Sequence, residues 1–247
     1  MAHDDDYFGA DVAAGYDAGS ADMFRPEAVD PPVDLLSGLA GDGPALEFGI
    51  GTGRLALPLA RRGVRVHGID LSRAMVEQLR AKPGGADLGV TIGDFATTRV
   101  TGAGTFTTAY LVYNTINNLT TQDAQVDCFR NAAAHLAPGG TFVVEVGVPE
   151  LRLLPPGQRA VPFHIDATSW AFDTLDPATQ AMSSHYVTIT DGRAEHRAIP
   201  FRYVWPSELD LMARLAGMRL RDRWQDWDGT PFTGESDRHV SVWEKTA

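Results

Sequence analysis

The sequence predicts an α/β protein with a doubly wound, largely parallel sheet and an antiparallel β insertion. Up to Val148, short apolar runs alternate with helix-like segments. Most of these runs show little alternation between polar and apolar residues, which is typical of parallel strands buried on both faces. After Val148, prolines and turn signals such as Asp176-Pro177 and Asp191-Gly192 separate further strand-like runs, which indicates antiparallel strands.

Strands joined by crossover helices account for the first part of the chain. Ser72 is suited to cap a helix over Arg73–Lys82, and Pro83-Gly84-Gly85 is a stop signal. A second helix is predicted over Asp123–Leu136, closed by Pro138-Gly139-Gly140. Successive β-α units with right-handed crossovers produce a doubly wound sheet. The expected strands are Ala45–Phe48, Val64–Ile69, Leu88–Ile92, Phe106–Val112 and Thr141–Val148.

The segment Pro149–Pro200 is predicted to be an insertion, because about 50 residues with few large apolar side chains are marginal as an independent domain. The α/β pattern then resumes with a helix that ends near Gly217, for which Ser207 is the expected N-cap and Asp210 the capping-box acid. The expected strands are Val161–Ile165, Ser169–Phe172, Ser184–Ile189 and Ala194–Phe201 in the insertion, and Arg219–Trp227 and His239–Glu244 in the core.

Composition and charge exclude several functions. The 21 Lys and Arg residues against 32 Asp and Glu give a net charge of −11, without a basic run, which argues against nucleic-acid binding. No apolar stretch approaches the roughly 18 residues of a membrane span, and the acidic N-terminus has no secretory pattern. The single cysteine, Cys128, has no partner for a disulfide or a metal site. We expect a cytoplasmic protein without a metal, a membrane contact or a nucleic-acid partner.

A glycine-rich turn follows the first predicted strand, in the segment Glu47-Phe48-Gly49-Ile50-Gly51-Thr52-Gly53-Arg54. Such a turn lets the backbone approach a ligand closely at the carboxyl end of a strand. The segment can be aligned with a dinucleotide fingerprint, or it can be a tight turn without a ligand. Glu47 weighs against the dinucleotide, because a carboxylate beside the turn repels a pyrophosphate and suits a ligand that carries ammonium and sulfonium groups.

Two further acidic residues follow the next two strands. Asp70 ends the second strand, where a carboxylate accepts hydrogen bonds from ribose hydroxyls, although it could also only cap the following helix. Asp94 and Phe95 follow the third strand, where Asp94 can accept from an adenine amino group and Phe95 offers a face for the base. Acids at three successive strand ends, with few basic residues near them, predict a binder of a non-phosphorylated adenosine.

These motifs together resemble those of class I S-adenosylmethionine-dependent methyltransferases, over residues 10–148 and 205–247. The turn Leu136-Ala137-Pro138-Gly139-Gly140 is also similar to one common in that family. The resemblance implies a seven-stranded mixed sheet of the Rossmann-like methyltransferase fold, with His239–Glu244 antiparallel to the rest. In layout, the chain is similar to bacterial small-molecule methyltransferases with a β-rich insertion after strand 5, including amino-sugar N-methyltransferases.

The same resemblance implies a layout and a set of cofactor contacts. The layout is a helical flap over residues 1–30, a cofactor-binding core over 31–148, a β-rich insertion on the substrate side over 149–204, and a last helix with two strands over 205–247. Tyr16 is expected to reach the methionine end of the cofactor or to anchor the flap, and Arg25 to pair with the methionine carboxylate or to remain solvated. The expected cofactor contacts are Tyr16, Arg25, Glu47, Gly49, Gly51, Gly53, Arg54, Asp70, Leu71, Met75, Asp94, Phe95 and Asn114.

The acceptor and any catalytic base are less defined by the sequence. The family lines its methyl-transfer channel after the fourth strand, where Tyr113, Asn114, Asn117 and Asn118 lie. Methyl transfer is an in-line displacement, for which alignment matters most, and an oxygen or carbon acceptor also gains from a general base. The expected catalytic residues are His164, Glu145 and Tyr113, and the expected substrate contacts are Asn117, Asn118, His185, Tyr203 and Trp205, each of which could also be an ordinary surface or core residue.

The sequence therefore predicts a methyltransferase that uses S-adenosyl-L-methionine and acts on a small molecule at N, O or C. Two alternatives stay open at this stage. A relative of the same fold could bind the cofactor and catalyse another reaction, or, with less support, the chain could be an NAD-dependent oxidoreductase. A homodimer is a further expectation.

Overall fold

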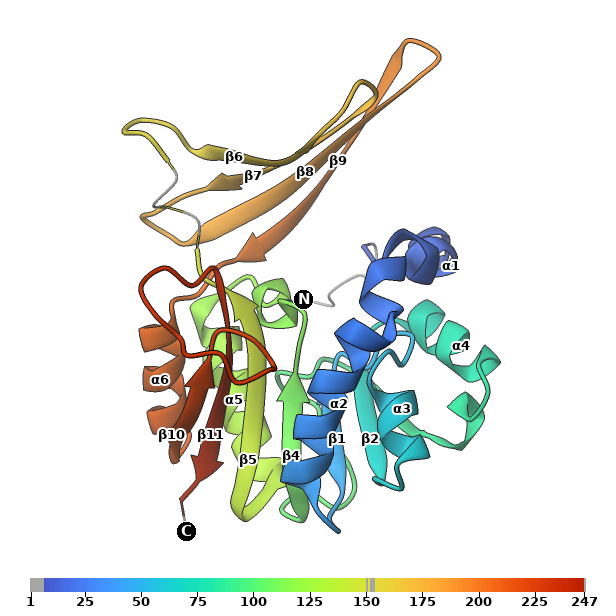
Figure 1. Cartoon of the computed structure of the whole chain (residues 1–247), viewed down its shortest axis with the longest axis vertical. Helices are drawn as coiled ribbons and strands as arrows, with labels where there is room; N and C mark the ends of the chain where they lie inside the picture. The colour runs from blue at the N-terminus through green and yellow to red at the C-terminus, as the bar shows by residue number, and fades with distance from the viewer. Residues whose placement is uncertain (1–6, 150, 152–153, 247) are drawn as a thin grey trace.

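The computed structural model describes residues 7–149, 151 and 154–246. Their strands form two sheets, a seven-stranded sheet with helices on both faces and a four-stranded sheet above its end (Figure 1). The predicted combination of an α/β core and an antiparallel insertion is confirmed. The six residues at the start of the expected flap lie outside the described residues.

The strand order of the large sheet is β10-β11-β5-β4-β1-β2-β3. The pairs β1–β2, β1–β4, β2–β3 and β4–β5 are parallel, while β11 runs antiparallel to both β5 and β10. The antiparallel direction of the last strand is thereby confirmed. The strands are β1 (Ala45–Phe48), β2 (Val66–Asp70), β3 (Gly89–Ile92), β4 (Phe106–Leu111), β5 (Leu136–Gly147), β10 (Met218–Trp224) and β11 (Arg238–Lys245).

Two apolar clusters, one on each face of this sheet, hold its helices. One contains Phe129, Phe142 and Trp243, whose rings pack at centroid distances of 5.1–6.5 Å beneath α5 and α6. The other packs α2, α3 and α4 against the opposite face, around residues such as Leu36 and Leu59. The helices are α1 (Ala10–Gly19), α2 (Pro26–Ala40), α3 (Ala56–Arg61), α4 (Arg73–Ala81), α5 (Gln122–His135) and α6 (Pro206–Leu215), with short 3-10 turns η1 (Ala21–Phe24), η2 (Gly85–Asp87) and η3 (Thr115–Asn118).

The helix caps agree with the sequence in one case and differ in another. Ser72 caps α4, because its Oγ accepts from the Met75 N–H at 3.1 Å. The expectation for Ser207 is wrong, since the N-cap of α6 is Trp205 and Pro206 takes the first helical position, which needs no N–H. The segment after α5 begins β5 at Leu136, which pairs with Phe106, but regular pairing with β4 resumes only at Thr141. The intervening Gly139 has a φ of +77°, as expected for a turn.

The boundary expected at residue 30 falls inside α2, which runs continuously from Pro26 to Ala40 although it contains Pro31 and Pro32. Both prolines lie in the second turn, beyond the four N–H groups at a helix start that have no intrahelical partner, so each removes one hydrogen bond of the helix. The flap therefore consists of α1 and η1, and α2 belongs to the core.

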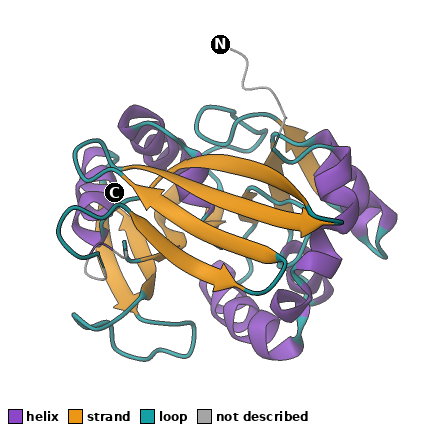
Figure 2. Cartoon of the chain, turned by 90° about the horizontal axis from the view of Figure 1, so that it is seen from above, coloured by secondary structure: helices purple, strands orange, loops and turns teal. Residues whose placement is uncertain are grey.

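The insertion is an antiparallel sheet in the order β6-β7-β8-β9, formed by β6 (Ala160–Ile165), β7 (Ser169–Leu175), β8 (Ala181–Thr190) and β9 (Arg193–Arg202). Seen from above, these strands lie across the end of the core (Figure 2). The end of β9 is fixed to the helices below by Arg202, whose side chain is 5% exposed and bonds to Glu208 at 2.7 Å. Gln125 and Gln180 also accept from the Arg202 guanidinium.

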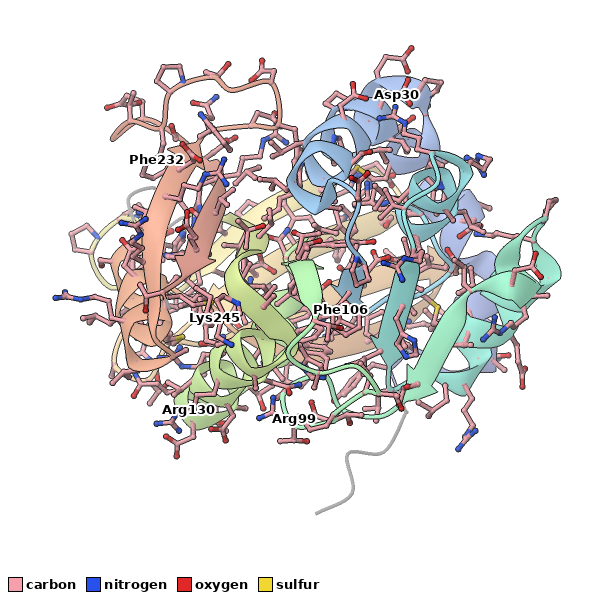
Figure 3. The ribbon with its side chains drawn as sticks, turned by 90° about the horizontal axis from the view of Figure 1, so that it is seen from below. Asp30, Arg99, Phe106, Arg130, Phe232 and Lys245 are labelled. Carbon is pink, nitrogen blue, oxygen red and sulfur yellow. The ribbon has the colours of Figure 1, made fainter. Side chains whose placement is uncertain are left out.

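The opposite end of the core carries several basic side chains, and Figure 3 shows Arg99, Arg130 and Lys245 there. These side chains are bonded to other groups of the protein. For example, Lys245 Nζ donates to the Leu136 carbonyl at 2.7 Å. Within the described ranges, the helices include none with the length and apolar character needed to cross a membrane.

Candidate active site

The glycine turn after β1 adopts a backbone that only glycine accommodates without strain. Gly49, Gly51 and Gly53 have φ values of +72°, +53° and +82°. A Cβ on Gly53 would stand 2.3 Å from Leu79 Cδ1, and one on Gly49 would stand 2.9 Å from Thr115 Cγ2. Gly53 is thus required by packing against α4, whereas Gly49 and Gly51 face a cavity.

Asp70 holds this turn from the end of β2. Its Oδ2 accepts from the Gly51 N–H at 2.6 Å, and its Oδ1 accepts from the Ser72 N–H at 2.8 Å. The carboxylate also lines the cavity. Asp70 is half-buried, supports the turn and lies on the wall of the cavity, which is the place expected for a ribose-binding acid.

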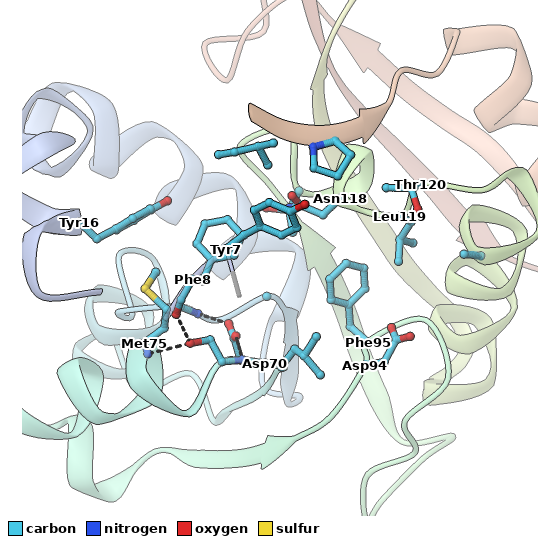
Figure 4. A pocket seen from close by; sticks show the side chains of 18 of the residues that line it. Tyr7, Phe8, Tyr16, Asp70, Met75, Asp94, Phe95, Asn118, Leu119 and Thr120 are labelled. Carbon is cyan, nitrogen blue, oxygen red and sulfur yellow. Dashed lines mark hydrogen bonds between the residues drawn. The ribbon is translucent and has the colours of Figure 1, made fainter. Parts of the chain in front are cut away.

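We call the cavity beside the turn the first cavity; its volume is about 330 Å³ (Figure 4). Leu71 and Met75 contribute apolar surface on one side. On the other, Phe95 stacks on Phe48 at 5.9 Å between centroids, and Asp94 is oriented by accepting from the Ala96 N–H at 2.8 Å. The described lining contains no Lys or Arg. A largely apolar cavity that is lined by two carboxylates and no described cation suits an adenosine and offers nothing to neutralise a phosphate.

Glu47 lies behind the turn and does not line the first cavity. It is 3% exposed, and Tyr110 Oη donates to its Oε2 at 2.9 Å. Burial raises its pKa to about 8, against the opposing effects of Tyr110 and Arg54. The sequence argument from Glu47 therefore needs correction, because this carboxyl is largely protonated at neutral pH and does not face a ligand. Asp70 and Asp94 are the acids that line the first cavity.

The flap is fastened to the turn by charged and polar contacts. Asp17 of α1 accepts from Thr52 Oγ1 at 2.6 Å and forms an ion pair with Lys82. Lys82 Nζ also donates to the Thr52 carbonyl at 2.8 Å and lies 5.1 Å from the centroid of the Phe24 ring. Farther toward the N-terminus, Ser72 Oγ donates to the Phe8 carbonyl at 2.6 Å. These contacts hold α1 over the first cavity.

A larger second cavity, of about 900 Å³, lies between the flap, the end of β4 and the insertion sheet. The two cavities share six lining residues: Tyr7, Phe8, Tyr16, Thr115, Asn118 and Ile199. Tyr16 lies at this junction, and burial, followed by the nearby Tyr113, raises the pKa of its phenol. The hydroxyl therefore stays protonated at neutral pH.

The end of β4 is a strained segment that faces the second cavity. Tyr113 and Asn114 have φ values of +57° and +60°, which is unusual for two successive residues other than glycine. Glu145 stabilises this backbone, since its Oε2 accepts from the Tyr113 N–H at 3.0 Å and its carbonyl accepts from the Asn114 N–H at 3.2 Å. Asn114 Oδ1 in turn accepts from the Gly147 N–H at 2.7 Å. Glu145 thus positions Tyr113 and Asn114 and does not itself line either cavity.

Several expected residues lie elsewhere. Arg25 is exposed and pairs with Asp22 at 2.7 Å, outside both cavities. His164 is also exposed, with Nε2 3.0 Å from Asp166 Oδ2, and does not line either cavity. Trp205 packs edge-to-face on Tyr203, so that Tyr203 lines the second cavity while Trp205 lies behind it.

His185 lies on the face of the insertion sheet that points away from the core. Its neighbours Ser184 and Tyr186 line the second cavity, and side chains alternate along a strand. His185 instead stacks between Phe172 and His196, with centroid distances of 4.8 and 5.2 Å. Contrary to the expectation from the sequence, neither His164 nor His185 lines the second cavity.

The sequence reasoning missed several residues that line the cavities. Tyr7 and Phe8 of the flap line both, and Asp173, Ser184 and Tyr186 of the insertion line the second. Alternation along the predicted strands could have placed Ser184 and Tyr186 on a common face. It could not have shown which face of the sheet meets the core. Among the described residues, no group of His, Cys, Asp and Glu could hold a metal ion.

Comparisons with known proteins agree with this geometry. A family model described as a methyltransferase domain matches residues 45–140. The CcbJ methyltransferase of Streptomyces caelestis is 35% identical and has a TM-score of 0.78, with 88% of this chain and 89% of that one covered. The cypemycin N-terminal methyltransferase of a Streptomyces species is 28% identical over 81% of this chain and 82% of its own. CalS10, an amino pentose methyltransferase of Micromonospora echinaspora, shares the fold with a TM-score of 0.69 and 20% identity, over 94% of this chain and 96% of its own.

The fold, the glycine turn and the strand-end acids define an enzyme that binds S-adenosylmethionine, and the identity with CcbJ extends along most of the chain. The chain therefore belongs to the S-adenosylmethionine-dependent methyltransferases. The residues present fit the cofactor, because Gly51 lines the first cavity without a side chain and Asp70 presents an oriented carboxylate beside it. Nothing in the site favours an NAD-dependent oxidoreductase or a reaction other than methyl transfer.

Proposed function

We propose that this enzyme transfers the methyl group of S-adenosylmethionine to the amine nitrogen of a small molecule bound in the second cavity. The observation that carries the proposal is the composition of that cavity. Its described lining has no histidine, lysine or cysteine, and its charged residues are Asp11, Asp173 and Asp237 against Arg197. Such a lining attracts a cation and offers no basic nitrogen as a general base for a hydroxyl acceptor.

The bound cofactor supplies an electrophilic methyl carbon on a sulfonium, which a neutral amine attacks directly. The protein's contribution is then alignment and the exclusion of water. The flap covers the first cavity, and the six residues shared by the two cavities form the passage between donor and acceptor. Tyr16, Thr115 and Asn118 supply polar groups at that passage and orient what reaches it. Two relatives named above, an N-terminal and an amino pentose methyltransferase, support a nitrogen acceptor.

The test is an acceptor screen with S-adenosylmethionine labelled in its methyl group. The library contains primary and secondary amines, amino sugars and short peptides with free N-termini, each beside its N-acetylated or hydroxyl counterpart. We expect label on amine nitrogens and none on the counterparts. Label on the hydroxyl compounds only, or no label on any amine although S-adenosylhomocysteine binds, would overturn the proposal. Homodimer formation and a cytoplasmic location stay predictions from the sequence.

A further inference from the structure

One acid of the second cavity differs from the others in its depth. Asp11 and Asp237 are exposed at the rim, whereas Asp173 is half-buried on β7 and lines the cavity from the insertion sheet. Exposed charges are weakened by water and salt, so the half-buried carboxylate has the stronger field inside the cavity. Burial raises the pKa of Asp173, which shows that its surroundings disfavour an uncompensated negative charge.

The neighbours of Asp173 fix its position but leave its charge available. Ser184 on the adjacent strand donates from Oγ to Asp173 Oδ1 at 2.5 Å, and the backbone of the two residues is paired in register. Tyr186 lies next along the same face of β8. Burial raises the pKa of its phenol, and the nearby negative charge of Asp173 raises that pKa further. The cationic Arg197 is placed 5.5 Å from the centroid of the Tyr186 ring.

Two of the aromatic rings that line the cavity are less available to an incoming cation. Arg197 already covers Tyr186, and Arg54 lies 5.4 Å from the centroid of the Tyr113 ring. Because one face of each ring carries a resident guanidinium, a second cation beside it is repelled. Neither of these two rings therefore competes with Asp173 for a positive charge beside it.

A second observation comes from the opposite wall. Asn117 of η3 lines the same cavity and is 7% exposed, and within the described structure its Oδ1 has no hydrogen-bond partner. A buried amide oxygen without a donor is costly and accepts readily from an N–H or O–H group. Acceptor groups on both walls therefore match a ligand that is rich in donors.

We propose that Asp173 is the specificity-determining residue that binds the protonated amine of the acceptor, with Ser184 as its positioning residue. The proposal rests on the proposed function and names the residue that selects the substrate class. Asp173 pairs with the ammonium form of the acceptor in the ground state and discriminates against neutral molecules of the same shape. The nitrogen becomes a nucleophile only after it releases a proton to water at the rim of the cavity, and the lone pair so freed attacks the methyl carbon.

The test uses binding, so that it does not depend on turnover. N-methyl-D-glucamine, a protonated amine at neutral pH, is compared with the neutral D-sorbitol on the full chain saturated with S-adenosylhomocysteine. We expect the wild-type protein to bind the amine about 10-fold more tightly or better, and Asp173→Asn to bind both alike. Asparagine still accepts from Ser184, so the sheet is preserved. Asp191→Asn, which removes an exposed acid of the turn between β8 and β9 outside both cavities, is the matched control and should retain the preference.

Two results would overturn the assignment. One is a wild-type protein that binds the two probes equally, and the other is an amine preference that survives in Asp173→Asn. Equal affinity of all variants for S-adenosylhomocysteine shows that the first cavity is intact. A wrong proposed function would give a different result. In the acceptor screen, the amines would then stay unlabelled with the wild-type protein and with Asp173→Asn alike.

Discussion

Asp70 accepts a hydrogen bond from the backbone N–H of Gly51 across 2.6 Å, so the end of β2 holds the glycine turn at the end of β1. Parallel pairing of Glu47 with Gly68 and of Phe48 with Ile69 sets this distance, because it brings the two strand ends to the same edge of the sheet. The turn and Asp70 are therefore one structural unit.

Replacement of Asp70 by alanine should remove both functions of this carboxylate. We expect the affinity for S-adenosylhomocysteine to fall about 100-fold, because a charge-assisted acceptor for ribose is lost and the turn loses its support. Calorimetric titration measures this loss. Asp127→Ala, which removes an exposed acid of α5, is the control. Undiminished affinity in Asp70→Ala would show that the ligand does not contact this acid.

Lys82→Met should loosen the flap without unfolding the core. The substitution removes the ion pair with Asp17 and the bond to the Thr52 carbonyl, both partly exposed. We expect faster release of S-adenosylhomocysteine and an affinity about 5- to 30-fold lower, which stopped-flow displacement can measure. Arg62→Met breaks an exposed ion pair between α2 and the end of α3 and serves as the control. Equal release rates in the two variants would contradict a fastening role for Lys82.

Glu47→Gln should change how stability depends on pH. The unfolded carboxyl titrates near 4.5, and burial raises the folded pKa to about 8. Between these values the folded state binds more protons, so this residue makes stability fall as pH rises from about 4.5 to about 8. A glutamine still accepts from Tyr110 and does not titrate. Relative to wild type, we expect Glu47→Gln to gain on the order of 3 kcal/mol between pH 5 and pH 9 in urea unfolding. A constant difference across that range would refute the raised pKa.

His239 should make stability depend on pH in the opposite direction to Glu47, so that stability falls as the pH falls. Its ring is fully buried on β11, Nδ1 lies 2.8 Å from Ser241 Oγ, and burial lowers its pKa to about 3 from an ordinary value of 6.5. The unfolded state therefore binds the extra proton, and the stability present above pH 6.5 is lost as pH falls toward 3. We expect His239→Gln to show a flatter decline between pH 6.5 and pH 4, by on the order of 2 kcal/mol. Parallel declines for the two proteins would place the acid sensitivity elsewhere.

The sequence could predict those parts of the site that follow directly from strand ends. Gly51, Asp70 and Asp94 each come within a few residues of a parallel strand, and parallel strands end at one edge of the sheet. The contact between Asp17 and Lys82 depends instead on how α1 docks onto α4, which no local pattern encodes. The prediction that the Glu47 carboxylate faces a ligand was wrong, since only the three-dimensional structure shows that it is enclosed beside Tyr110.

The insertion shows why the acceptor side was harder to predict. Alternation along β8 separates Ser184 and Tyr186 from His185, but a hairpin sheet has two faces and the sequence does not state which one covers the core. The cap of α6 was mispredicted for a related reason. Asp210 is engaged by Arg223 at 2.7 Å and by Trp243 Nε1 at 2.9 Å, contacts that bridge distant parts of the chain.

The four strands of the insertion follow β5 and precede α6, so they form one continuous stretch of the chain. The glycine turn, Asp70 and Asp94 are all encoded upstream of it. Exchange of this stretch between related enzymes, with Arg202 and Glu208 retained to fasten its end, would replace one wall of the second cavity and, of the first cavity, only Ile199 and Pro200. One contiguous segment is therefore the natural unit for engineering that wall.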